Sequence, residues 1–359
     1  MAKARRTLTG RLLAAAVGLL LAAALSEGLW RLAEPPPTTA PTIRGADGTE
    51  VPLSLVATYL GRNDEDRAPT SPSSRLAPNL ELRFCYSALE RPWLDADGCV
   101  SVRTNSLGFR DLEFDATKPA GQRRVLCVGD SFTFGNGVPL EDTWVQRLEG
   151  LLEQRWDDVE VINGGFAAGD HRTGGYAPWI ASDGLALDPD LVVIGVCLND
   201  LGDVPMALTP PPPEERWLGG ISHVLNALQD RRHRREFEAT ALPDAGVLLD
   251  LVPEPWNAAR AALTTLRDLC AERDVELLVV VFPMFFRLEE DRYPFHGLHR
   301  AVTEFCGTAG IDCIDLYPTF AGQPDRPLWI HPTDQHANPI GQALIAEALL
   351  PRVVGALER

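Results

Sequence analysis

The feature that most constrains the fold is an alternation of short apolar runs with amphipathic stretches from Val125 onward. Five runs have the length and composition of buried strands: Val125–Val128, Val159–Asn163, Leu191–Cys197, Val275–Pro283 and Ile311–Leu316. Helical patterns lie between or after them, at about Thr143–Arg155, Ala258–Glu272, Leu298–Thr308 and Gly341–Leu357. Buried strands that alternate with helices are typical of a parallel sheet covered on both faces. The sequence therefore predicts an α/β fold.

A serine stands where the first of these runs ends. The chain leaves the run through Gly129-Asp-Ser131, and the glycine permits a sharp turn and a close approach of substrate. Open α/β sheets place their reactive groups at the carboxyl ends of the strands. Three other stretches belong to the same edge of the predicted sheet: Asn163–Gly169, Asn199-Asp200 and His331–Gly341. We expect one site there, although each stretch alone also fits an ordinary turn or loop.

These stretches supply the residue types that catalysis by a nucleophilic serine requires. Such a serine needs a general base, a group that orients the base, and donors for the oxyanion. His336 can take the Ser131 proton, and Asp334, two residues before it, can hold the imidazole tautomer. The Asn199 amide, the Ser131 N–H and an N–H of the glycine-rich loop can serve as oxyanion donors. The set predicts an acyl-enzyme mechanism.

Taken together, the four stretches resemble the sequence blocks of SGNH, or GDSL-type, hydrolases, from about Val125 to the C-terminus. Asn105–Asp111, just upstream, resembles a lead-in of membrane-anchored bacterial members. The resemblance implies a flavodoxin-like three-layer α/β/α sandwich that works without a cofactor or metal. It also implies the role of each site residue: Ser131 as nucleophile, His336 as base, Asp334 as its partner, and Gly169 and Asn199 in the oxyanion hole.

The second and third blocks depart from the usual pattern of the family. The block-two glycine usually falls five residues after the asparagine, where this chain has Ala168, with Gly169 one position later. Because the oxyanion donor is a backbone N–H, either residue can supply it. Cys197 stands two residues before Asn199, where glycine is common. The choice between Ala168 and Gly169 stays open at this point.

The C-terminal stretch holds two histidines, His331 and His336. We favour His336 as the base because Asp334 precedes it at the spacing of the family. Asn338 and Gly341 follow in the expected register, although alanine replaces the usual proline directly after His336.

The N-terminus carries a targeting signal. Lys3, Arg5, Arg6 and Arg11 precede an apolar run, Leu12–Leu25, which Leu29, Trp30 and Leu32 extend. A basic flank before such a run indicates a signal peptide or a signal anchor over residues 1–33. We favour the uncleaved anchor because no clear small-x-small cleavage site follows. Either form predicts an exported domain, and the anchor predicts attachment to a membrane.

The rest of the N-terminal region divides into a linker and a β-rich lead-in. Residues 34–79 are rich in proline and serine and predict a linker, with a small hairpin around Asp47-Gly48. Residues 80–122 form the lead-in, where Leu80–Tyr86 and Val100–Thr104 alternate like half-buried strands. Cys85 and Cys99 could face each other there as a disulfide, which an exported protein permits. Seven cysteines leave at least one without an intrachain partner.

The hydrolase domain spans residues 123–359 and contains an insertion at about residues 203–252. A run of basic residues in the insertion, Arg231–Arg235, fits a solvated helix face or a contact with an acidic ligand. Cys127 and Cys197 lie in apolar runs and are expected to be buried as small hydrophobic residues. Neither the oligomeric state nor the acyl chain follows from these patterns.

A formal net charge of −17 argues against nucleic acid as a partner. The favoured function is an exported, membrane-anchored serine esterase that cleaves carboxylic esters, with a small molecule, carbohydrate or lipid as the alcohol. An alternative is a polysaccharide O-acetyltransferase, because hydrolysis and transfer share one acyl-enzyme. A further alternative is a non-catalytic protein of the cell envelope that binds carbohydrate on the same scaffold.

Overall fold

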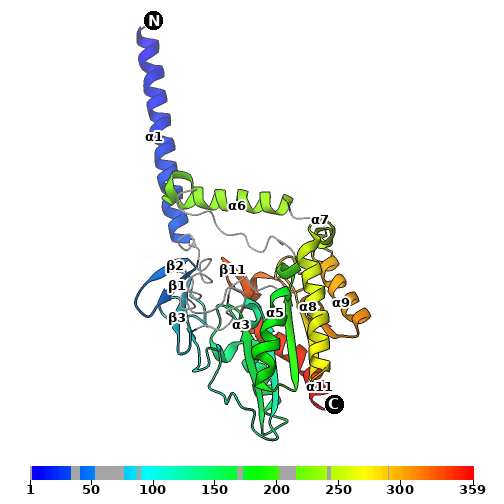
Figure 1. Cartoon of the computed structure of the whole chain (residues 1–359). Coiled ribbons are helices and arrows are strands. Elements are labelled where there is room, and N and C mark those ends of the chain that lie inside the picture. The colour runs from blue at the N-terminus through cyan, green and yellow to red at the C-terminus, as the bar shows by residue number, and fades with distance from the viewer. Residues whose placement is uncertain are drawn as a thin grey trace. The chain divides into compact units, whose positions relative to one another are not determined.

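The structure is a computed structural model that describes residues 2–33, 41–52, 77–86, 90–167, 173–201, 216–240, 244–289 and 291–359. The chain divides into two compact units. The smaller comprises Met1–Ala40, Ser87–Leu89 and Leu208–Thr240, and the larger comprises Pro41–Tyr86, Glu90–Ala207 and Ala241–Arg359 (Figure 1). All the candidate catalytic residues belong to the larger unit.

A parallel sheet of five strands forms the centre of the larger unit, in the order β6-β5-β7-β8-β9. The strands are β5 (Arg123–Gly129), β6 (Val159–Gly165), β7 (Leu191–Cys197), β8 (Glu276–Phe282) and β9 (Asp312–Asp315). Every residue of β7 is buried, as expected for an apolar strand at the middle of a covered sheet. The predicted parallel sheet is confirmed at the positions of the five apolar runs.

The strand order reverses at β5. The next strand in sequence, β6, lies on one side of β5, and the following strand, β7, lies on the other. Open α/β sheets bind ligands outside the carboxyl ends of their strands at such a point. Ser131 begins the short helix α3 (Ser131–Phe134) directly after β5. The topology therefore places this serine at the usual position of a ligand crevice.

Helices cover the sheet and share one hydrophobic core with it. Helix α4 (Trp144–Leu152) lies beside α11 (Pro339–Leu357), and α5 (Thr173–Trp179) lies beside α8 (Pro253–Ala271). The larger unit also contains α7 (Leu248–Leu251), α9 (His296–Ala309) and α10 (Tyr317–Phe320). The Thr143 hydroxyl caps α4 by accepting a hydrogen bond from the Gln146 N–H at 3.3 Å. The predicted α/β fold of sheet and helices is confirmed.

A second, antiparallel sheet precedes the parallel sheet in the chain, in the strand order β2-β1-β3-β4. It consists of β1 (Thr42–Gly45), β2 (Glu50–Pro52), β3 (Glu81–Cys85) and β4 (Cys99–Arg103). The predicted hairpin around Asp47-Gly48 is confirmed, because Ile43 pairs with Val51 across it. The sheet thus takes in two strands from the segment predicted as a linker, while residues 53–76 lie outside the described residues.

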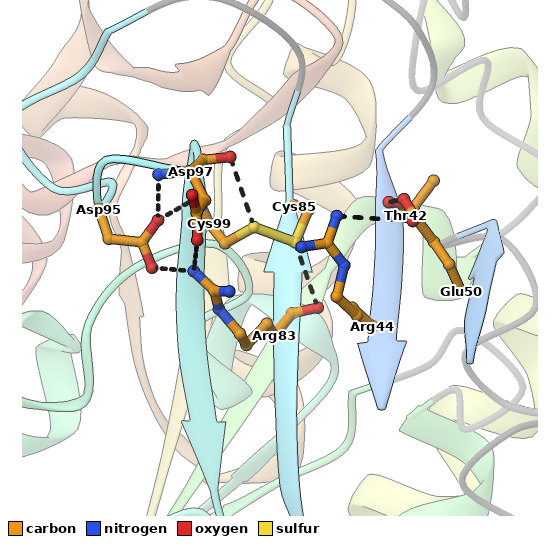
Figure 2. The surroundings of a disulfide bond; sticks show 8 residues. All are labelled: Thr42, Arg44, Glu50, Arg83, Cys85, Asp95, Asp97 and Cys99. Carbon is orange, nitrogen blue, oxygen red and sulfur yellow. Dashed lines mark hydrogen bonds and ion pairs between the residues drawn. A yellow bond between two sulfur atoms is a disulfide. The ribbon is translucent and has the colours of Figure 1, made fainter. Parts of the chain in front are cut away.

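A disulfide joins β3 to the edge strand β4 of this lead-in sheet. Cys85 pairs with Cys99 across β3 and β4, and their sulfur atoms are bonded, as Figure 2 shows. Beside it, the Arg83 guanidinium forms ion pairs with Asp95 and Asp97. The expected pairing of these cysteines is confirmed. The other five cysteines form no disulfide: Cys127, Cys197, Cys270, Cys306 and Cys313. Cys127 and Cys197 are buried, as predicted.

The lead-in sheet packs against the segments that follow the carboxyl ends of the parallel strands. Its apolar side chains, among them Phe84 and Tyr86, form one buried cluster with Phe134 at the end of α3 and with Ile330. Ile330 belongs to a hairpin of β10 (Trp329–His331) and β11 (Asp334–Ala337). The lead-in is therefore built into the same core as the segments that carry the candidate catalytic residues.

The smaller unit contains the N-terminal helix α1 (Ala2–Ala33) and the insertion helix α6 (His223–Thr240). Residues Leu13–Leu32 of α1 are long and apolar enough to cross a membrane, with a mean hydropathy of 1.8. Pro339–Leu357 passes the same test, but that segment is the partly buried α11. The Glu27 carboxylate accepts hydrogen bonds from the His223 N–H and the Ser222 hydroxyl, both at 2.8 Å, at the start of α6.

Candidate active site

A strand, a sharp turn and a short helix present Ser131. Strand β5 ends at Gly129, and Asp130 is the N-cap of α3. The Asp130 carboxylate accepts a hydrogen bond from the Phe132 N–H at 3.0 Å, which fixes the first turn of the helix. α3 ends at Gly135, whose φ of 80° lies in the left-handed region that glycine favours. The serine is thereby held at the carboxyl edge of the sheet.

Three of the predicted residues form one hydrogen-bonded chain. The Ser131 Oγ lies 2.7 Å from the Nε2 of His336, and the His336 Nδ1 lies 2.6 Å from the Oδ1 of Asp334. The same Oδ1 also accepts from the backbone N–H of His336 at 3.0 Å. When Nδ1 donates its proton to the carboxylate, the lone pair of Nε2 faces the serine hydroxyl.

The hairpin of β10 and β11 explains why a spacing of two residues suits this pair. Successive side chains of a strand point to opposite faces, so Asp334 and His336, both on β11, share one face. Asn338, just beyond the strand, caps α11 by accepting hydrogen bonds from the N–H groups of Ile340 and Gly341 at 3.0 and 3.2 Å. The capped helix fixes the position of the strand that carries the histidine.

The electrostatics of the pair favour a charged carboxylate beside a basic imidazole. Burial alone would lower the pKa of His336, but the charge of Asp334 and its hydrogen bonds outweigh burial and raise it. Burial alone would raise the pKa of Asp334, but the charge of His336 and the hydrogen bonds to the carboxylate lower it below its usual value. The imidazole can thus accept the Ser131 proton and hold it as a stabilised imidazolium.

Two glycines allow α3 to lie directly on the strand ends. A Cβ atom at Gly165, the last residue of β6, would lie 2.2 Å from the backbone nitrogen of Phe134. A Cβ atom at Gly129 would lie 2.2 Å from the Thr133 hydroxyl oxygen. Real Cβ atoms do not approach other atoms so closely, so any side chain at Gly165 would displace the helix that carries the serine.

The Asn105–Asp111 motif fixes the same helix and the neighbouring strand. The guanidinium of Arg110 donates to the carbonyl oxygens of Phe134, Gly135 and Val138, which surround the end of α3. The Asp111 carboxylate accepts from the backbone N–H of Asn163 on β6 at 2.7 Å. The sequence showed this motif only as a family resemblance, and the structure gives it a physical role in placing α3 against β6.

The structure describes two of the predicted oxyanion donors, Ser131 and Asn199, but not the glycine-loop donor. Asn199 lies in the 3-10 turn Leu198–Leu201 after β7, the strand that pairs with β5. Ser131 and Asn199 therefore follow neighbouring strands at the same edge of the sheet. Gly169 and Ala168 lie outside the described residues. The loop is described as far as Ala167, whose carbonyl oxygen accepts from the Asn136 side chain at 3.3 Å.

The second histidine of the C-terminal stretch has other contacts. The Nδ1 of His331 lies 2.7 Å from the Thr333 hydroxyl oxygen, and its ring centroid lies 5.4 Å from that of Tyr86. His331 is fully buried. The imidazole that lies within hydrogen-bond distance of Ser131 is that of His336, in line with the preference drawn from the sequence.

Sequence reasoning missed one residue at the site. The Tyr86 hydroxyl, at the end of β3, donates to the second carboxylate oxygen of Asp334 at 2.7 Å. The two residues are 248 positions apart, and no motif joins them. Over the described part of the chain, no group of three or more His, Cys, Asp or Glu side chains is arranged to hold a metal ion.

Ser131 thus lies at the switch point of a parallel sheet and is hydrogen-bonded to a histidine that is itself paired with an aspartate. Residues 127–344, more than half of the chain, match the GDSL-like lipase/acylhydrolase family. The chain belongs to this family and is an ester hydrolase. No curated protein matches it.

Several solved structures are similar in fold. One is a two-domain esterase active on acetylated mannans, 13% identical over 66% of this chain and 50% of that one, with a TM-score of 0.42. This chain thus spans half the length of that two-domain esterase. Another is a putative acylhydrolase from Bacteroides fragilis NCTC 9343, 14% identical over 67% of this chain and 91% of that one, with a TM-score of 0.39. A mutant of an acetyl-xylooligosaccharide esterase from Geobacillus Stearmophilus is 17% identical over 66% and 96%, with a TM-score of 0.41.

Proposed function

We propose that this protein is an exported serine esterase that cleaves carboxylic esters through a Ser131–His336–Asp334 triad. The observation that carries the proposal is the unbroken chain of hydrogen bonds, 2.7 Å from serine to histidine and 2.6 Å from histidine to aspartate. Distances of this size lie within the reach that proton transfer between such groups requires.

The proposed mechanism has two halves. The Ser131 oxygen attacks the ester carbonyl carbon while His336 Nε2 takes the hydroxyl proton, and the carbonyl oxygen becomes an oxyanion. Collapse of this intermediate breaks the bond to the alcohol, which leaves with the proton that His336 returns. Water then attacks the acyl-enzyme in the same way, and Ser131 regains its proton when the acid leaves.

We further propose that the oxyanion is held by the Ser131 N–H, the Asn199 side chain and a backbone N–H of the loop at Ala168 or Gly169. The first amides of a helix have no acceptor within the helix, so the Ser131 N–H is available for such a bond. Asn199 reaches the edge of the sheet from the strand next to β5. Donors of this kind act where charge develops in the transition state.

We propose a membrane-anchored location with the catalytic unit in the periplasm or outside the cell. The support is the apolar stretch of α1, Leu13–Leu32, preceded by four basic residues that favour the cytoplasmic side. On this view residues 1–33 are the anchor, and residues 123–359 are the catalytic domain. In that location, O-acyl groups on carbohydrate or lipid are the accessible esters.

The test is hydrolysis of an ester panel by the full-length protein in detergent. The panel contains p-nitrophenyl esters of increasing acyl length, together with acetylated xylan and acetylated mannan. The Ser131→Ala and His336→Ala variants are each expected to lose at least about 10³-fold in kcat/KM. Two substitutions serve as matched controls. Ser182→Ala changes an exposed serine that is hydrogen-bonded to Asp183, and His299→Ala changes a histidine whose Nδ1 lies 2.7 Å from the Oδ1 of Asp315.

Full activity in Ser131→Ala would refute the proposed triad. A sugar acceptor added to the reaction separates hydrolysis from transfer, because an acylated sugar among the products would identify an O-acyltransferase that uses the same site. A folded protein without turnover on any ester or acceptor would favour the carbohydrate-binding alternative.

A further inference from the structure

The lead-in sheet contributes a side chain to the proposed triad. Tyr86 follows the last residue of β3, and its hydroxyl donates to Asp334 Oδ2 at 2.7 Å. The other carboxylate oxygen, Oδ1, already accepts from the ring and the backbone of His336. Tyr86 therefore donates the hydrogen bond that Oδ2 accepts, whereas His336 occupies Oδ1.

Both partners of this hydrogen bond are shielded from water. Tyr86 is 4% exposed and Asp334 is 5% exposed. Burial, followed by the nearby charge of Asp334, raises the pKa of Tyr86 well above its usual value, so the phenol stays protonated and acts as a donor. Without the phenol, a buried carboxylate oxygen would lose its partner, and such a loss is costly.

The surroundings of Tyr86 show a site shaped around its hydroxyl. A Cβ atom at Gly137, where φ is 77°, would lie 2.5 Å from the Tyr86 hydroxyl oxygen. The ring packs against His331 at a centroid distance of 5.4 Å, and the backbone N–H donates to the Gly98 carbonyl at 2.9 Å. These contacts leave the tyrosine little freedom to turn away from Asp334.

The disulfide lies next to this tyrosine in the chain. Cys85, bonded to Cys99, directly precedes Tyr86, and the bond ties β3 to β4 at the end nearest the active edge. Figure 2 shows that Arg83 adds ion pairs to Asp95 and Asp97 beside the same bond. The segment that delivers the tyrosine is thus fixed covalently in the oxidised protein.

We infer that Tyr86 is a positioning residue for the esterase reaction, which holds the Asp334 carboxylate in line with His336 and depends on the Cys85–Cys99 disulfide for its own placement. The inference rests on the proposed triad. It makes the lead-in sheet a part of the active site, completed when the exported chain forms its disulfide.

The charged and titratable groups around this carboxylate set the expected pH effect. His336 and Tyr86 contact Asp334, Arg110 lies near Tyr86, and Asp130 lies near His336. The Tyr86 bond draws negative charge away from the carboxylate. Its removal therefore leaves more charge facing His336, which stabilises the imidazolium and moves the acid limb of the pH–rate profile to higher pH.

The test compares Tyr86→Phe, which keeps the ring, with Tyr293→Phe. Tyr293 is equally buried, at 3% exposure, and its hydroxyl oxygen lies 2.9 Å from another histidine, His299. We expect Tyr86→Phe to lower kcat about tenfold at an unchanged KM. By NMR titration, we expect the pKa of His336 to rise by roughly half a unit. Tyr293→Phe should lower the melting temperature about as much as Tyr86→Phe does, but it should change neither kcat nor the pKa of His336.

A second arm tests the link to the disulfide. The double variant Cys85→Ser/Cys99→Ser should lower kcat in the wild-type background. Its effect in a Tyr86→Phe background should be smaller, because both changes act through the same hydroxyl. If the cysteine substitutions lower kcat by the same factor in both backgrounds, the disulfide does not act through Tyr86 and the link between them is overturned.

A Tyr86→Phe enzyme with the kcat and the His336 pKa of the wild type would overturn the positioning role. The two proposals fail separately. Full activity in Ser131→Ala refutes the triad, whereas the NMR titration of His336 tests the effect of Tyr86 whether or not the protein turns over.

Discussion

The guanidinium of Arg110 lies over the ring of Phe134, 5.0 Å from its centroid, and donates to the carbonyl oxygen of the same residue at 2.7 Å. Arg110 is 2% exposed and also donates to the carbonyls of Gly135 and Val138. Burial lowers its pKa to about 10, so it remains charged at neutral pH. A buried cation from the lead-in motif thus closes the end of the helix that begins with Ser131.

Arg110→Met should be strongly destabilising. The change removes the charged donor shared by three carbonyl oxygens and leaves the Phe134 and Gly135 carbonyls with only long hydrogen bonds, at 3.5 and 3.4 Å. We expect a loss of about 2–4 kcal/mol in the free energy of unfolding. Urea titration followed by circular dichroism measures it. Arg103→Met is the control, because that side chain is 72% exposed and pairs with the exposed Glu81. A change of less than about 0.5 kcal/mol is expected there. Equal effects of the two variants would refute the role given to Arg110.

Gly165→Ala should reduce stability and activity together. The new methyl group would meet the backbone nitrogen of Phe134 at 2.2 Å, so α3 must move away from β6. Overpacking of this kind costs about 1–3 kcal/mol. Gly150→Ala in α4 is the control, since nothing lies within 4 Å of its added methyl. Thermal melts and esterase assays should show a stabilised, fully active Gly150→Ala. Wild-type kcat in Gly165→Ala would contradict the close packing.

The activity should fall on the acid side of neutrality. The base must be neutral to take the Ser131 proton, and the Asp334 charge raises the pKa of His336 above 6.5. Below that pKa the imidazole is protonated, so kcat/KM should drop tenfold for each further pH unit, with a midpoint above 6.5. In Asp334→Asn the raising charge is absent, so the midpoint of the residual activity should move to lower pH. A midpoint that stays the same in Asp334→Asn would show that Asp334 does not set the pKa of His336.

Asn199→Ala should fold normally and lose roughly 10²-fold in kcat. The reason is the loss of one donor to the oxyanion, which is absent from the bound ester and develops in the transition state that leads to the tetrahedral intermediate. Steady-state kinetics and a thermal melt give the two numbers. Asn257→Ala, an exposed residue of α8, is the matched control and should keep full activity. A near-normal kcat in Asn199→Ala would remove this amide from the mechanism.

The sheet and the core of the site could be predicted from sequence because their signals are local. Five apolar runs marked the strands, and the two-residue spacing of Asp334 and His336 reflects the alternation of one strand. Helix α5 could not be predicted, because Thr173–Trp179 contains two glycines and Pro178, which disfavour helix formation. Its Tyr176 and Trp179 are buried, so tertiary packing overrides the weak propensity.

The contacts of Tyr86 and Arg110 were also beyond sequence reasoning. Tyr86 reads as the end of an alternating strand, and its partner Asp334 is 248 positions away. Arg110 sits in a motif known only by resemblance, and its partners are backbone carbonyls, which carry no sequence signature. Both contacts arise where residues of the lead-in region pack on the segments that carry the proposed triad, and periodicity and motif spacing do not encode such tertiary contacts.

The central claim is that Ser131 is an activated nucleophile. The most direct measurement is the intact mass of the full-length protein in detergent after incubation with a fluorophosphonate, beside Ser131→Ala. One adduct per chain, absent from Ser131→Ala and mapped to the peptide that contains residue 131, is the predicted result. A folded wild-type protein without an adduct, or an adduct that persists in Ser131→Ala, would contradict the claim.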